Sequence, residues 1–184
     1  MKPVIRLLGA WLLAATVAAP ASAQAPSAPE RSVKAVFLYK FLNYAEWPSA
    51  AFASDDAPYV IGILGADDVA RELSQIAADH TVGGRPVQVR RVKRGEPLSG
   101  IHVLFVGAAE SKELPALSRQ AQGNGVLLVS EDQRAAKPES AINLVVDDGK
   151  VRFDVSLDVA EKSGVHLSSR LLGVARSVRS AGGP

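Results

Sequence analysis

Strand-length apolar segments alternate with helix-length amphipathic segments through the middle of this chain, and this alternation constrains the fold more than any other feature. The segment after the first apolar run places Val69, Leu73 and Ile76 on one helical face. The predicted strands are 59–64, 87–92, 101–106 and 125–129, and the predicted helices between them are 66–79 and 110–122. Strands that alternate with helices form βαβ units, so the sequence predicts a largely parallel sheet with helices on both faces.

The last third of the chain departs from this alternation. Two β-rich runs, 142–146 and 151–155, flank an Asp-Asp-Gly-Lys turn, which is typical of a hairpin. We therefore expect one α/β domain with a five- to six-stranded sheet and a C-terminal β-hairpin strand. Beyond it, the pattern predicts a short helix that ends at Gly164 and a final helix, capped by Ser168 or Ser169, that continues through Val178.

An aromatic segment precedes the first strand. Residues 33–48 (VKAVFLYKFLNYAEWP) are predicted to form a helix that Ser32 caps and Pro48 ends. The polar residues Lys40, Asn43 and Glu46 recur every three positions and form one narrow stripe, so most of the helix surface has to be covered. Two compatible interpretations follow: the helix packs on the sheet, or its Trp47 end contacts a second copy or a partner.

The first residues have the three parts of a secretory signal. Lys2 and Arg6 form a basic start, an apolar run follows, and Ala21-Ser22-Ala23 offers a cleavage site. A membrane anchor needs about 20 apolar residues, and Pro20 shortens this run. We predict a cleaved signal peptide over 1–23, a flexible Pro- and Ala-rich leader over 24–31, and the domain over 32–180.

Charge and cysteine content exclude several classes of function. Without Lys2 and Arg6, 19 basic side chains of the 21 remain against 19 acidic ones, so the exported chain is neutral. A neutral chain lacks the electrostatic basis for nucleic-acid binding. The chain contains no cysteine, which excludes disulfides, thiol redox chemistry and cysteine-bound metals.

The sequence carries none of the common motifs for catalysis or cofactor binding. The loop after the first predicted strand, residues 65–68, has neither a dinucleotide fingerprint nor a P-loop, and its two aspartates would repel a pyrophosphate. No G-x-S-x-G or S-x-x-K occurs, and the three histidines stand singly without metal-ligand spacing. We expect no catalytic residue, no metal and no cofactor; a hydrolase with an unrecognised site is the remaining enzymatic alternative.

Two stretches resemble a known family. The segment 34–48 (KAVFLYKFLNYAEWP) is similar to the start of the YfiR/HmsC-like domain, formerly a domain of unknown function. The segment 151–178 resembles the end of that family, where a Phe-acidic strand leads to a Gly, two serines, a basic residue and two leucines. Here these are Gly164, Ser168, Ser169, Arg170, Leu171 and Leu172.

The resemblance implies a non-enzymatic periplasmic regulator. According to this resemblance, the protein would be a homodimer that binds and represses the periplasmic sensor region of an inner-membrane diguanylate cyclase or of another inner-membrane signalling protein. Such repression would lower cyclic di-GMP and biofilm formation. Two features depart from the family: Ser156 stands where Asn is common, and the cysteines that form disulfides in some members are absent.

Five residues are the candidates for contacting a partner or ligand: Trp47, His166, Ser168, Ser169 and Arg170. The alternative function is a receptor for a nucleotide or another anion, held by the strand-end loops together with the motif from His166 to Arg170. Ser-Ser-Arg at a helix start supplies hydrogen-bond donors and positive charge. The same serines also suit a purely structural role as a helix cap.

Overall fold

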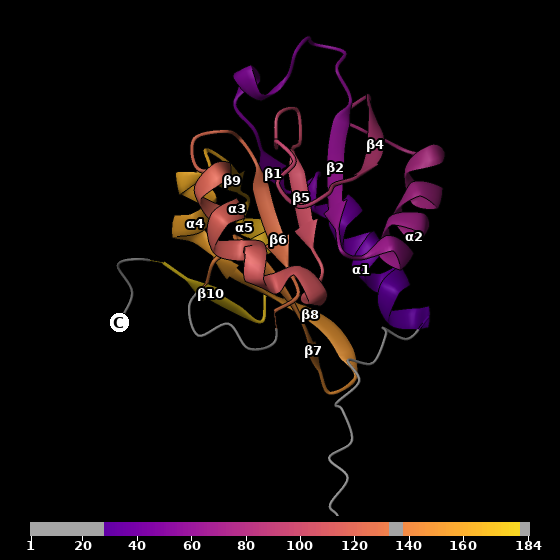
Figure 1. Ribbon diagram of the computed structural model, residues 1–184, viewed down its shortest axis with the longest axis vertical. Coiled ribbons are helices and arrows are strands. Elements are labelled where there is room, and N and C mark those ends of the chain that lie inside the picture. Colours follow the sequence, from indigo (N-terminus) through magenta and orange to yellow (C-terminus); the bar gives the residue numbers. More distant parts are fainter. Residues whose placement is uncertain (1–27, 133–137, 181–184) are drawn as a thin grey trace, which may run out of the picture.

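An eight-stranded sheet forms the centre of the molecule (Figure 1). The computed structural model describes residues 28–132 and 138–180, and the predicted signal peptide, 1–23, lies outside them. The strand order across the sheet is β10-β8-β7-β6-β5-β2-β4-β3. In the part of the chain that is described, no helix combines the length and the apolar character needed to cross a membrane.

The central strands of the sheet are parallel. Strand β2 (Tyr59–Leu64) pairs with β4 (Arg85–Arg91) on one side and with β5 (Val103–Val106) on the other. Strands β6 (Leu127–Ser130) and β7 (Ile142–Asp147) continue the parallel set beyond β5. These strands confirm the α/β class and the largely parallel sheet that the alternating pattern predicts.

The predicted hairpin is confirmed, and short edge strands widen the sheet beyond the expected five to six strands. Strand β8 (Lys150–Ser156) runs antiparallel to β7, joined by a turn in which Asp148 and Gly149 both have positive φ. Strand β10 (Ser177–Arg179) pairs with β8, and β3 (Thr81–Val82) forms a small hairpin with β4. These additions are two and three residues long, too short for a recognisable strand pattern.

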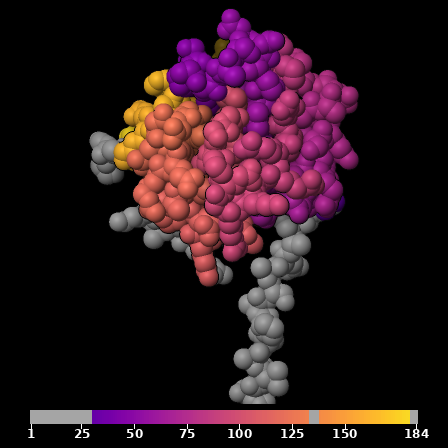
Figure 2. Space-filling view, turned by 45° about the horizontal axis from the view of Figure 1, so that its top comes forward, coloured from indigo at the N-terminus to yellow at the C-terminus, as the bar shows by residue number. Residues whose placement is uncertain are grey.

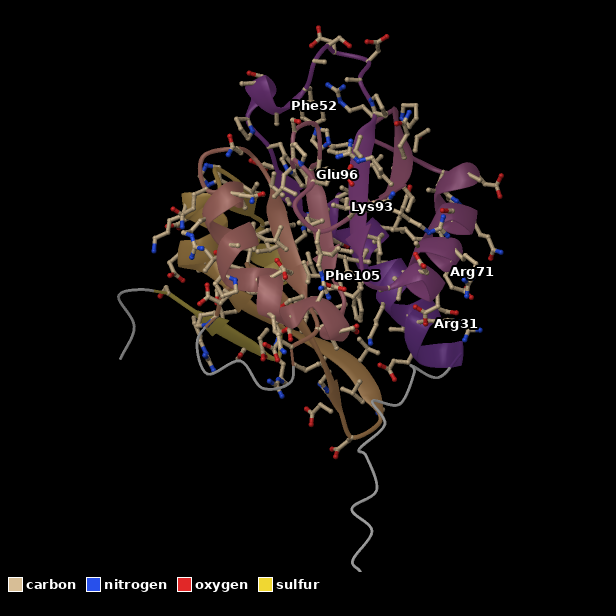
Figure 3. All side chains as sticks on the ribbon, viewed as in Figure 1. Arg31, Phe52, Arg71, Lys93, Glu96 and Phe105 are labelled. Carbon is tan, nitrogen blue, oxygen red and sulfur yellow. The ribbon has the colours of Figure 1, made fainter. Side chains whose placement is uncertain are left out.

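Helices cover both faces of the sheet. Helices α1 (Ala28–Phe41) and α2 (Asp67–Ala78) pack on the face that carries Phe105, which lies at the centre of the molecule (Figure 3). The 3₁₀ helix η2 (Ala108–Glu113) leads into α3 (Leu114–Ala121), which packs on the opposite face. The side chains of each strand alternate between these two cores.

The boundaries of the first helix differ from the prediction. Helix α1 begins at Ala28, so residues 28–31 of the predicted leader belong to it. Ser32 lies inside the helix, where its hydroxyl donates to Glu72 Oε2 at 3.1 Å instead of capping. The helix ends at Phe41, and the chain then turns into strand β1 (Ala45–Glu46) and the 3₁₀ helix η1 (Ser49–Ala51). Helical periodicity continues to Trp47, but strand pairing of β1 overrides it.

The chain end also differs from the prediction. Helix α4 (Leu157–Lys162) ends before Gly164 as expected, and strand β9 (His166–Leu167) follows. Helix α5 (Ser169–Leu172) is a single turn and does not continue through Val178. Instead Arg176 donates its backbone N–H to the Phe153 carbonyl at 2.8 Å and its guanidinium to Asp154, which draws the segment onto the sheet edge as β10.

Candidate functional site

The two stretches that carry the family resemblance meet in the fold. Strands β1 and β9 form a two-stranded antiparallel ladder in which Ala45 faces Leu167 and Glu46 faces His166. The Ser168 backbone N–H extends the ladder by donating to the Tyr44 carbonyl at 2.8 Å. Residues from the beginning and the end of the domain therefore form one unit beside the large sheet.

Trp47 is held mainly by internal contacts. Its ring packs edge-on against Tyr59 at a centroid distance of 5.4 Å, and its indole N–H donates to the His102 carbonyl at 3.2 Å. Tyr59 begins β2 and His102 precedes β5, so Trp47 lies at the amino end of the parallel strands. A contact between the half-buried Trp47 and a partner stays a prediction.

His102 is the centre of an aromatic cluster at this end of the sheet. The imidazole is 3% exposed, stacks on Phe52 at 4.5 Å, and accepts the Val60 backbone N–H on Nδ1 at 3.1 Å. The Arg85 guanidinium lies over the Phe52 ring, 4.2 Å from its centroid. The segment 47–58 arches over the cluster and forms the raised top of the space-filling view (Figures 1 and 2). Figure 3 places Phe52 under this arch.

Burial lowers the pKa of His102 below its ordinary value of 6.5, and the positive charge of Arg85 adds to this, against an opposing contact with the Ala51 backbone. Because Nδ1 accepts a hydrogen bond, the neutral ring carries its proton on Nε2. A proton added to Nδ1 would break the bond to Val60. The folded protein therefore binds this proton more weakly than the unfolded chain does.

We expect the stability of the folded protein to fall as the pH decreases below about 6.5, because only the unfolded chain then binds the His102 proton. Each unit of pKa depression contributes about 1.4 kcal/mol to this loss. Urea unfolding at pH 7.5 and pH 5.5 measures it, with His102→Gln as the comparison. His80 and His166 are present in both proteins, so the difference between the two proteins isolates His102. An equal loss of stability in both would contradict the assignment.

In the segment from His166 to Arg170, one serine caps a helix and three other side chains face solvent. Ser168 is the N-cap of α5, and its hydroxyl accepts the Leu171 backbone N–H at 3.4 Å, so the predicted capping role is confirmed for Ser168. The side chains of His166, Ser169 and Arg170 are exposed. Three of the five predicted residues thus present their side chains to solvent.

Arg170 reaches a groove between α1 and α2. The other residues that line this groove are Val36, Tyr39, Lys40, Asn43, Tyr44, Ile76 and His80. Trp47 is not among them, since its ring turns toward Tyr59 and His102. The structure therefore brings the backbones of the two motifs together but directs Trp47 and Arg170 to different surroundings.

The carboxyl ends of the parallel strands, where such sheets usually bind ligands, are closed between β2 and β5. The Gly107 N–H donates to the Leu64 carbonyl at 2.8 Å, and a Cβ on Gly107 would lie 2.5 Å from the Gly65 carbonyl oxygen. Glu110 fills the remaining space beside Gly65 and forms a bidentate ion pair with Arg94. These strand-end loops lie at the opposite end of the sheet from Trp47, so they do not join the 166–170 motif in one ligand site.

A buried ion pair joins α1 to the sheet, and the sequence pattern gave no sign of it. Lys34, 4% exposed, donates to Glu131 and to Glu30, and Glu131 Oε1 accepts the Ala108 backbone N–H at 2.9 Å. Burial lowers the pKa of Lys34, but the hydrogen bonds to Glu131 and Glu30 outweigh it and hold the pKa above its usual value. Lys34 therefore anchors the helix.

A protein-family model matches most of the chain. The model of the YfiR/HmsC-like family matches residues 31–176, which span most of α1, every strand of the large sheet except β10, and the helices up to α5. Both stretches that carry the resemblance fall within the match, apart from the last two residues of the second one, 177 and 178. Among the described residues, no group of three or more His, Cys, Asp or Glu side chains is placed to hold a metal ion. The chain belongs to the YfiR/HmsC-like family.

Proposed function

We propose that this protein is a non-enzymatic periplasmic regulator that binds and represses the periplasmic sensor region of an inner-membrane diguanylate cyclase. Repression of the cyclase would lower cyclic di-GMP and biofilm formation. Family membership supports a regulatory role in the periplasm, and the predicted signal peptide agrees with export. The same kinship is the support for action as a homodimer.

The observation that carries this proposal is the junction of the two family motifs. They come from opposite ends of the domain and pair as β1 and β9, next to the exposed side chains of His166, Ser169 and Arg170. Helix α1, with Lys34 and Phe41 buried, fixes the position of this unit on the sheet. A rigid, solvent-facing unit of this kind suits recognition of a protein surface.

Arg170→Glu is expected to weaken capture of the partner by about tenfold or more, because arginine at an interface often contributes more than 1 kcal/mol and the glutamate reverses its charge. The measurement is copurification of the protein with the cyclase sensor region from the periplasm, together with cellular cyclic di-GMP. Arg119→Glu, on the exposed face of α3, is the matched control.

Unchanged capture and unchanged cyclic di-GMP in a folded Arg170→Glu protein would remove this residue from the proposed surface. Arg170 gives a sharper test than Trp47, because Trp47→Ala also removes the packing on Tyr59 and the hydrogen bond to His102. Loss of capture in a Trp47 variant would therefore not separate recognition from folding.

A further inference from the structure

Helix α1 carries apolar side chains on its outer face as well as on the face that packs on the sheet. Val33, Val36, Phe37 and Lys40 follow the spacing i, i+3, i+4, i+7 and so form one stripe along the helix. Val33 and Val36 are each 40% exposed, whereas Leu38, on the inner face, is fully buried. An apolar stripe that faces solvent is typical of an interaction surface.

A groove lies on each side of this stripe. The first is the groove between α1 and α2 that contains Val36, Tyr44 and Arg170. The second runs between α1 and the β7–β8 hairpin, and its lining residues are Phe37, Lys150, Val151, Arg152, Phe153, Val174 and Arg176. Val174 is 71% exposed, the most exposed of the large apolar side chains in the described part of the chain. The stripe and the two grooves together are called the α1 face below.

The charged side chains that line the two grooves are all basic. Lys40 and Arg170 line the first groove, and Lys150, Arg152 and Arg176 line the second. As far as residues 28–132 and 138–180 show, neither lining contains an aspartate or a glutamate. The two internal carboxylate partners, Asp147 for Arg152 and Asp154 for Arg176, lie outside the lining. A chain with equal numbers of acids and bases after position 23 thus concentrates bases here.

We propose that the α1 face docks an acidic segment of a partner protein that also carries apolar side chains. This inference rests on the proposed function and names the chemistry of the partner surface. Apolar side chains would fill the grooves beside Val36 and Val174, and carboxylates would meet the surrounding cations, which provide specificity and a fast encounter. The face is continuous with the β1–β9 ladder, because Tyr44 lines the first groove and its carbonyl accepts the Ser168 N–H.

The charge pattern selects this occupant over two others. A second copy docked through the same face would set cations against cations, which disfavours a symmetric dimer at this surface. An anionic bilayer would satisfy the cations, but a flat surface would leave both grooves unfilled. A protein segment with acidic and apolar side chains satisfies charge and shape together.

The test uses a defined probe with the exported form of the protein. The protein is titrated into a fluorescein-labelled helical peptide in which turns of Glu alternate with turns of Leu, and binding is measured by fluorescence anisotropy. A second peptide, in which Gln replaces every Glu, is titrated in the same way. We expect the Glu peptide to bind at least about tenfold more tightly and to weaken as salt is raised. Lys40→Glu and Lys150→Glu should each reduce its binding by about tenfold, whereas Arg119→Glu should leave it unchanged. Thermal melts establish that each variant is folded.

Equal binding of the Glu and Gln peptides, or equal effects of Lys40→Glu and Arg119→Glu, would overturn the proposal. Vesicles of phosphatidylglycerol that bind more tightly than the peptide, and lose binding in the same variants, would assign the face to lipid instead. Periplasmic copurification distinguishes failure of the docking face from failure of the proposed function. A captured membrane signalling protein that still binds the Lys40→Glu and Lys150→Glu variants would refute the docking face and leave the proposed function standing.

Discussion

Replacing Glu131 with alanine is expected to lower the free energy of unfolding by about 3–5 kcal/mol, because Lys34 then loses a buried partner. Lys34 is 4% exposed and Glu131 is 8% exposed, so water does not readily replace the missing carboxylate. The Ala108 backbone N–H, which donates to Glu131 Oε1 at 2.9 Å, loses its acceptor as well. Urea unfolding at neutral pH measures the loss.

The double variant Lys34→Met, Glu131→Leu is the control for this prediction. It removes both charges and fills the space with apolar atoms, so we expect it to be more stable than Glu131→Ala alone. A cost below about 1 kcal/mol for Glu131→Ala would show that Glu30, which also accepts from Lys34 at 2.6 Å, satisfies the ammonium by itself.

Phe41→Ala is expected to lower the free energy of unfolding by about 3–5 kcal/mol, since it removes the ring that packs α1 against β8 and leaves a cavity. The Phe41 ring is 1% exposed and meets Phe153 edge-on at a centroid distance of 5.4 Å. Phe37, whose ring also contacts Phe153 at 5.6 Å, is partly exposed and is the matched control. We expect a clearly smaller loss for Phe37→Ala in the same urea titrations. A larger loss for Phe37 than for Phe41 would contradict the described packing.

The first family motif, residues 34–48, contains both buried structural residues and residues that face solvent. Lys34 and Phe41 join α1 to the sheet and are buried, whereas Val36, Lys40 and Tyr44 face solvent. The motif therefore combines a folding role with an exposed surface. The interpretation that the helix packs on the sheet is confirmed for the buried side chains, whereas contact of the Trp47 end with a second copy or a partner stays a prediction.

The parallel sheet could be predicted from the sequence because its central strands, such as β5 and β6, are buried on both faces and form continuous apolar runs. The predicted range 59–64 coincides with β2, and 142–146 differs from β7 by one residue. The end of α1 could not be predicted in this way. Residues 42–47 keep helical spacing, yet 42–44 form a turn, and only pairing with β9, far along the chain, makes residues 45 and 46 a strand.

The same limit applies to the site. The Lys34–Glu131 pair joins residues 97 positions apart, and no local pattern indicates such a contact. His102 falls at the start of the predicted strand 101–106, but its burial among Trp47, Phe52 and Tyr59 depends on the fold of the loop at 47–58. The capping role of Ser168 is local and was within reach of sequence reasoning.

Photo-crosslinking in living cells tests most directly whether the protein acts by binding a membrane signalling protein. A photoreactive amino acid is placed at position 170 of the exported protein, and at position 119 as the control, and the adducts are identified by mass spectrometry. We expect position 170 to capture an inner-membrane protein with a periplasmic sensor region and a diguanylate cyclase domain, and position 119 not to. Adducts without any inner-membrane signalling protein at position 170, or the same adducts from both positions, would contradict this role.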